Sequence, residues 1–362
     1  MNRCMSALTL CAASLLVLSH TGCKNGQTTT QPPVEATKTI ADIEQLSPEL
    51  SSIIPDGARL EKMATGFTWT EGPVWVQPGM LMFADIPSNS IRQMTSDGKV
   101  TIWLQPSGYV AKEPFGGKEP GTNGMTLDDK LRLTVAGHAA RSILRFETMD
   151  PKGTKTVLAD SYEGKPLNSP NDVVYGPDGS LYFTDPPYGL PTQQDDDPSK
   201  KLKVNGVYRI PNATAVKAGS APNRAKLQLL IGDLPRPNGI AISPDNKWLY
   251  VADSQQKKWM RYPLKSGGTV GEGMVFLDAS SAKGTGTPDG MKVDSQGILF
   301  ATGPGGVWII SPEGKHLGTI LTEKPTANVA WGGEDGKTLY LTTSDAIYRI
   351  PVKVVGYRPW IH

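Results

Sequence analysis

The chain has 362 residues, which suffices for one large domain or two average ones. Its 39 glycines and 30 prolines favour many short strands joined by turns over long helices. The formal net charge of +2 is spread without a basic stripe or arm, which excludes the electrostatic footprint of a nucleic-acid binder or of a protein bound to an anionic membrane surface.

The N-terminus has the pattern of an export signal. Arg3 precedes an apolar run over 7–18, and small residues follow up to Gly22 and Cys23. Gly22-Cys23 before a Thr-, Gln- and Pro-rich stretch resembles a bacterial lipoprotein signal, with a plain secretory signal as the alternative. We predict a signal peptide over 1–22, a flexible lipoprotein-like tether over 23–45, a lipid anchor at Cys23, and export to the periplasm or the cell surface. The mature chain would keep Cys23 as its single cysteine, which excludes an internal disulfide and a Cys-ligated zinc site.

A polar turn followed by an apolar alternating strand recurs through the rest of the chain. The strands are predicted at 81–85, 131–134, 181–185, 249–253, 298–302 and 339–343. Their spacing suits a four-stranded sheet per repeat, with one insertion near 190–205, and turns such as 177–179 and 244–246 have hairpin chemistry. Six such sheets predict an all-β fold, a six-bladed β-propeller over 46–362. A pair of β-sandwich domains is the alternative, but no linker interrupts the spacing.

An oxygen-bearing side chain stands before the innermost strand of each repeat, 8 to 11 residues ahead of the strands given above. The six residues are Glu71, Asn123, Asn171, Asn238, Asp289 and Asn328. Equivalent positions of different blades converge on the axis of a propeller, so these side chains are predicted to meet there. Any one Asn-Gly or Asp-Gly pair is more often a turn, but turn chemistry does not require a side-chain oxygen in register six times.

Such a ring suits a hard divalent cation. Calcium takes about six to eight oxygen ligands from carboxylates, amides and water. Glu71 and Asp289 would supply two negative charges, and Asn171 and Asn238 two neutral oxygens, so the site would be balanced in charge and open to substrate. Zinc is disfavoured because it prefers His and Cys ligands. We therefore predict a divalent cation, Ca²⁺ first, at these four residues.

The motifs that carry these residues resemble the senescence marker protein/gluconolactonase family, also called regucalcin-like, over about residues 60–350. They are Glu71-Gly72-Pro73-Val74-Trp75, residues 169–173 continuing through 182–190, and residues 287–291. The resemblance implies a propeller lactonase with the same four metal ligands and with Asn123 on the substrate side. Where the gluconolactonase branch often has His-Gly-Asp-Arg-Arg, this chain has His138-Ala139-Ala140-Arg141. Paraoxonases and diisopropyl fluorophosphatase are more distant relatives.

The resemblance implies hydrolysis of a small-molecule lactone, with a gluconolactone-like sugar lactone as the first choice. The cation would polarise the lactone carbonyl while water attacks. Asp289 is the predicted catalytic base, and water activated by the cation or His138 are the alternatives. His138 and Arg141 are predicted on the substrate side, although a structural strand histidine and a surface ion pair are simpler roles.

Two other classes of function stay open on the same residues. One is a phosphotriesterase or aryl esterase that uses the same metal site, and the other is a non-catalytic surface propeller that binds a sugar or a protein. A nucleophile elbow and a free catalytic thiol are both missing from the sequence, which disfavours a covalent hydrolase. We predict neither a nucleic-acid partner nor a protein partner.

Overall fold

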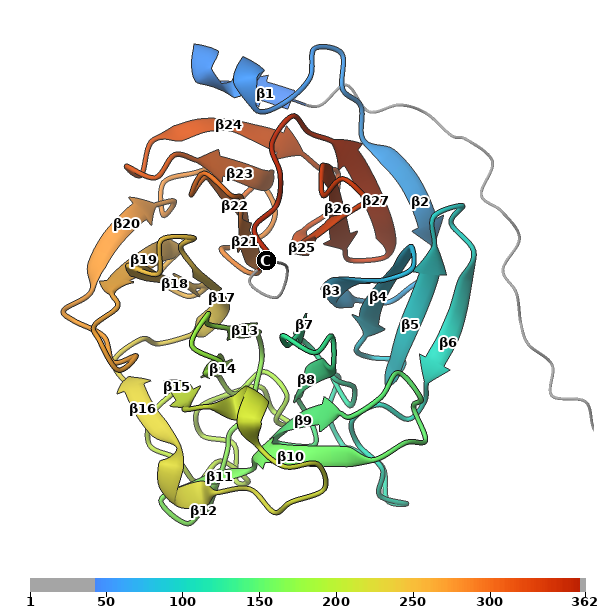
Figure 1. Ribbon diagram of the computed structural model, residues 1–362, viewed down its shortest axis with the longest axis vertical. Coiled ribbons are helices and arrows are strands. Elements are labelled where there is room, and N and C mark those ends of the chain that lie inside the picture. Colours follow the sequence, from blue (N-terminus) through green and yellow to red (C-terminus); the bar gives the residue numbers. More distant parts are fainter. Residues whose placement is uncertain (1–42, 359–362) are drawn as a thin grey trace, which may run out of the picture.

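The computed structural model describes residues 43–358. The predicted signal peptide over 1–22 and most of the predicted tether lie outside the described residues. Six antiparallel sheets stand radially around a central channel (Figure 1), which confirms the predicted all-β, six-bladed propeller. No helix among residues 43–358 is both long enough and apolar enough to cross a membrane.

In each blade the strands follow one another from the channel outward. The first three blades contain β3 (Thr70–Val76), β4 (Met80–Asp85), β5 (Ser90–Thr95) and β6 (Val100–Leu104); β7 (Met125–Leu127), β8 (Leu133–Gly137), β9 (Ser142–Phe146) and β10 (Lys155–Ala159); and β13 (Val173–Tyr175), β14 (Leu181–Asp185), β15 (Gly206–Ile210) and β16 (Gln228–Ile231). The next two contain β17 (Pro237–Ile242), β18 (Trp248–Asp253), β19 (Lys258–Pro263) and β20 (Met274–Asp278); and β21 (Met291–Val293), β22 (Leu299–Gly303), β23 (Gly306–Ile310) and β24 (His316–Leu321).

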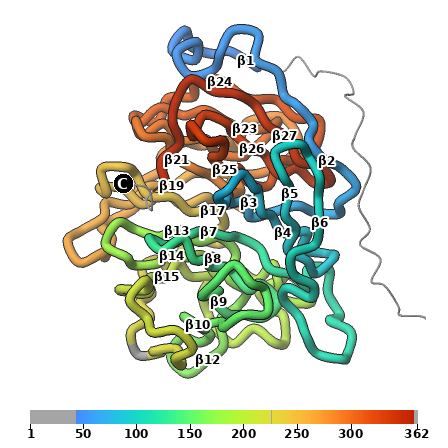
Figure 2. Tube along the Cα trace, turned by 45° about the vertical axis from the view of Figure 1, so that its right-hand side comes forward, coloured from blue at the N-terminus to red at the C-terminus, as the bar shows by residue number. Residues whose placement is uncertain are grey.

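The sixth blade joins both ends of the described chain. It contains β25 (Thr326–Gly332), β26 (Thr338–Thr343), β27 (Ala346–Pro351) and, as its outermost strand, β2 (Glu61–Thr65). Figures 1 and 2 show β2 beside β27, and this pairing closes the ring. A further strand, β1 (Ile43–Gln45), pairs with β24 of the fifth blade. These three residues were assigned to the end of the tether, but Ile43 packs against the apolar cluster that blades five and six share.

The strands predicted from the repeat are the second strand of each blade. They stand out in the sequence because they are buried on both faces. In β4, Leu81 and Phe83 pack in a cluster with Tyr340 of the sixth blade, whereas Met82 packs against Leu133 of the second. Two of the predicted strands started too early. Leu131 is exposed in a turn with a φ of +57°, so the second strand of that blade is Leu133–Gly137. The second strand of the fifth blade is Leu299–Gly303 instead of 298–302.

Irregular connections and short elements decorate the blades. The described residues include the hairpin β11 (Ser161–Tyr162) and β12 (Lys165–Pro166), and the 3₁₀ helices η1 (Pro48–Ser52), η2 (Ala213–Ala215) and η3 (Arg224–Lys226). The predicted insertion is the connection 186–205 between β14 and β15, and a second long connection, 105–124, joins β6 to β7.

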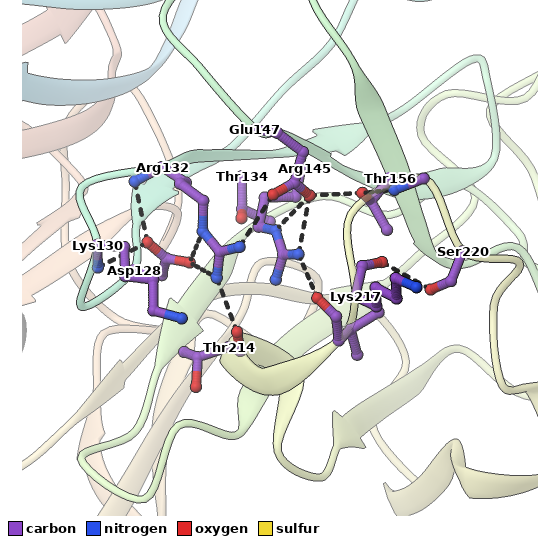
Figure 3. A network of polar contacts seen from close by, with 12 residues as sticks. Asp128, Lys130, Arg132, Thr134, Arg145, Glu147, Thr156, Thr214, Lys217 and Ser220 are labelled. Carbon is purple, nitrogen blue, oxygen red and sulfur yellow. Dashed lines mark hydrogen bonds and ion pairs between the residues drawn. The ribbon is translucent and has the colours of Figure 1, made fainter.

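Buried guanidinium groups fasten the third blade to the second (Figure 3). Arg145 of β9 donates to the backbone oxygen of Ala213 at 2.8 Å and to that of Val216 at 2.6 Å. Arg132 donates to the oxygen of Thr214 at 2.7 Å, and both arginines pair with Glu147. The η2 connection therefore receives charged donors from the neighbouring blade at three of its carbonyl groups, of which that of Ala213 also accepts from the backbone N–H of Val216.

Candidate functional site

The predicted ligands lie where the innermost strands start. Glu71 is the second residue of β3 and Asn238 the second residue of β17, while Asn171 and Asp289 each precede an innermost strand by two residues. Together with Asn123 they line a cavity of about 290 Å³ at that end of the channel. The structure thus brings together five of the six residues that the repeat placed in register.

The glycine after a ring residue allows the innermost strands to crowd together. A Cβ on Gly72 would lie 2.2 Å from the backbone oxygen of Asn123, and one on Gly239 would lie 2.0 Å from that of Asp289. Gly72 also has a φ of +51°. The Glu-Gly and Asn-Gly pairs are therefore needed for close approach of neighbouring blades at the axis. A register shift in β3 between Glu71 and Val74, and one in β17 between Pro237 and Ile240, mark bulges where the side-chain direction changes.

The two carboxyl groups of the ring lack a compensating positive charge. Burial, reinforced by the charges of Asp172 and Glu119, raises the pKa of Glu71 to about 7, although the Gly72 N–H and Asn328 donate to it. Burial and the nearby Glu71 charge raise the pKa of Asp289 well above its usual value. Two carboxylates held this close favour a shared cation over two protons at neutral pH.

Two ring oxygens have no hydrogen-bond partner among residues 43–358. The Asn238 amide donates to the Ser254 hydroxyl at 2.9 Å, and that hydroxyl donates to the oxygen of Pro288 at 2.7 Å. The amide is thereby fixed with its Oδ1 free of hydrogen bonds, and Asp289 Oδ1 is also buried without one. Buried polar atoms are nearly always satisfied, so this pair indicates a ligand that the protein atoms do not replace. These residues fit a hard cation.

The donor set is of mixed type. Within residues 43–358, no group of three or more His, Cys, Asp and Glu side chains is placed to hold a metal. The ring instead combines two carboxylates with amide oxygens, as calcium accepts. Its sixth member, Asn328, does not line the cavity, because its amide donates to Glu71 Oε2 at 3.2 Å and its oxygen accepts from Val329 N at 2.9 Å and Lys292 Nζ at 3.3 Å.

His138 and Arg141, predicted on the substrate side, do not line the cavity. His138 is fully buried, with Nδ1 3.0 Å from the oxygen of Pro170 and Nε2 2.9 Å from Glu119 Oε2. Arg141 donates to the backbone oxygens of Leu167 at 2.6 Å and Ser199 at 3.0 Å. Both side chains are held by protein groups behind the cavity wall.

Six cavity residues were not predicted as site residues. They are Trp69, Glu119, Tyr188, Gln193, Ser254 and Thr287. Tyr188 lies within the motif at residues 182–190 but was not predicted as a site residue. Burial raises the pKa of its hydroxyl to about 12, so this group is neutral at physiological pH. Glu119 and Gln193 come from the two long connections, 105–124 and 186–205, whose extra length is not repeated in the other blades, so neither residue has an equivalent position in the repeat.

Comparison with known proteins gives three findings. The family model described as "SMP-30/Gluconolactonase/LRE-like region" matches residues 69–345. A gluconolactonase of Zymomonas mobilis is 37% identical over 332 residues, which cover 88% of either chain. The solved structure of a gluconolactonase from Xanthomonas campestris is 27% identical with a TM-score of 0.72, and the match covers 89% of this chain and all of that one.

Proposed function

We propose that this lactone hydrolase opens a sugar lactone such as gluconolactone, because the chain belongs to the SMP-30/gluconolactonase/LRE-like family. The reaction would need a divalent cation, and calcium is the ion that we propose. One observation carries the metal part of the proposal. Two buried carboxyl groups and two amide groups from four blades meet in one cavity, and Asn238 Oδ1 and Asp289 Oδ1 have no hydrogen-bond partner there.

Glu71, Asn171, Asn238 and Asp289 would hold the cation. Ser254 fixes the Asn238 amide and Asn328 holds the Glu71 carboxylate, so these two of the four ligands are oriented by hydrogen bonds within the protein. When bound, the cation supplies Lewis-acid stabilisation of the negative charge that develops on the lactone carbonyl oxygen.

The residues around the ring would complete the reaction. Asp289 is the proposed base for the attacking water, because it faces the cavity with one oxygen free of hydrogen bonds. Asn123 lines the substrate side, and the neutral Tyr188 hydroxyl can donate to a substrate oxygen. His138 and Arg141 would act by positioning other groups, since both ring nitrogens of His138 and the Nε and Nη1 donors of Arg141 already contact protein oxygens.

A substrate panel with metal control tests the proposal. The purified protein would be assayed on sugar lactones, unsubstituted lactones, aryl esters and a phosphotriester, first after dialysis against a chelator and then with added calcium. We expect hydrolysis of a sugar lactone that is lost on chelation and restored by calcium. Lactone hydrolysis that chelation leaves unchanged would exclude metal dependence, and activity confined to the phosphotriester or the aryl esters would exclude the lactonase.

A further inference from the structure

The wall of the cavity holds a third carboxylate, Glu119, that the proposed metal site does not use. Its side chain is 22% exposed. Glu119 Oε2 lies 2.9 Å from Nε2 of the fully buried His138, and Oε1 accepts from Gln193 Nε2 at 2.9 Å. The three residues come from three places in the chain: the 105–124 connection, the end of β8, and the 186–205 connection.

Each of these partners is fixed in turn. His138 Nδ1 lies 3.0 Å from the oxygen of Pro170, and Gln193 Nε2 also donates to the oxygen of Tyr188 at 3.0 Å. A Cβ on Gly189 would stand 2.6 Å from the imidazole carbons, so the loop backbone lies directly over the ring. His138 therefore has no room to swing, and Glu119 is held from behind in one orientation.

This arrangement leaves the Glu119 carboxylate, which lines the cavity, with free sites for accepting hydrogen bonds. A carboxylate has about four lone-pair sites and no proton to donate when ionised, and His138 and Gln193 occupy only one site on each oxygen. Trp69 and Tyr188 line the same cavity. Aromatic surface with a few fixed polar groups is the usual composition of a site that orients a small molecule.

We propose that Glu119 is a specificity-determining residue, whose carboxylate accepts hydrogen bonds from hydroxyl groups of a polyhydroxylated lactone, with His138 and Gln193 as its positioning residues. This inference rests on the proposed function and names the side chains that would recognise the hydroxyl groups of the sugar lactone. A direct role on the cation is disfavoured, because no trio of His, Cys, Asp and Glu groups among the described residues is placed to hold a metal.

The test compares two lactones that differ in their hydroxyl groups. Glu119→Gln would be assayed at saturating calcium on D-glucono-δ-lactone and on δ-valerolactone, which has the same ring without hydroxyls. We expect kcat/KM to fall about 10- to 100-fold on the sugar lactone, mainly through KM, as for hydrogen bonds to a charged acceptor. On δ-valerolactone the change should stay within about threefold. Glu113→Gln is the matched control, because it removes an exposed carboxylate from the same connection outside the cavity.

A second variant tests the positioning role. Gln193→Ala removes one donor to Glu119 and should raise KM for the sugar lactone without changing kcat on δ-valerolactone. An equal loss on both lactones in Glu119→Gln would overturn the proposal, because Glu119 would then belong to the machinery common to all substrates. No loss on either lactone would overturn it as well.

Binding of a polyol separates this inference from the proposed function. D-glucitol carries the hydroxyl groups but no lactone, so its binding by calorimetry does not depend on turnover. We expect wild type to bind it at least about tenfold more tightly than Glu119→Gln. Equal binding by the two proteins, or none by wild type, would overturn the role of Glu119. Inactivity of wild type on every lactone would instead overturn the proposed function, while the glucitol comparison would still decide about Glu119.

Discussion

Removing the charge of Glu71 should stabilise the metal-free protein at alkaline pH and destabilise the calcium-loaded one. Burial raises the pKa of Glu71 from 4.5 to about 7. The folded protein then binds more protons than the unfolded chain between these two values, so stability is lost as pH rises from about 4.5 to 7 and the whole loss is present above pH 7. At about 1.36 kcal/mol per pKa unit the cost is about 3 kcal/mol. The variant Glu71→Gln avoids this cost and also lessens the repulsion on Asp289.

The assay is thermal unfolding at pH 5 and pH 8, with chelator and with calcium. In chelator at pH 8 we expect Glu71→Gln to melt roughly 6 °C above wild type, at about 2 °C per kcal/mol for a large domain, and the difference should shrink at pH 5. With calcium at about 1,000 times its Kd for wild type the order should reverse, because binding adds about 4.1 kcal/mol to wild type alone, which exceeds the cost of about 3 kcal/mol. Glu334→Gln, which changes an exposed carboxylate, is the control. Equal melting of wild type and Glu71→Gln in chelator at both pH values would refute the reasoning.

Four further outcomes are expected. Asp289→Asn should stay at least about 100-fold below wild-type kcat at saturating calcium, and near-normal turnover would show that another group is the base. His138→Ala should keep its calcium affinity within about threefold by calorimetry, and a larger loss would place the imidazole in the metal site. Arg145→Met should lower stability to urea by about 3–5 kcal/mol, because it removes a fully buried guanidinium from its network, whereas Arg349→Met breaks an exposed pair and should cost at most about 1 kcal/mol. Mass spectrometry of the exported protein should find Cys23 lipidated, and a chain cut elsewhere would remove the anchor.

The fold could be predicted because the same sequence pattern recurs in every blade. The second strand of each blade is buried on both faces between neighbouring blades, so runs such as Leu81–Asp85 and Leu249–Asp253 read as apolar strands at regular spacing. A propeller brings equivalent positions to its axis. The register of the repeat therefore sufficed to predict that Glu71, Asn123 and Asp289 lie in one cavity. The prediction needed no knowledge of long-range contacts, since symmetry supplied them.

The direction of individual side chains was decided by contacts between distant segments. Asn328 is in register with the other ring residues, yet its amide donates to Glu71, which is 257 positions away, and it leaves the cavity wall. His138 points to Glu119 because Gly189 covers its ring.

The number of blades and the oxygen-bearing side chains of the ring could be predicted from the sequence, because both follow from a local pattern repeated in register. The surroundings of the ring depend on how distant segments pack. Glu119 and Gln193 are 74 positions apart, on connections whose extra length no other blade repeats, so no periodicity marks them. They meet because two irregular loops fold over the same end of the channel, and such packing depends on the whole fold rather than on the residues nearby in the chain.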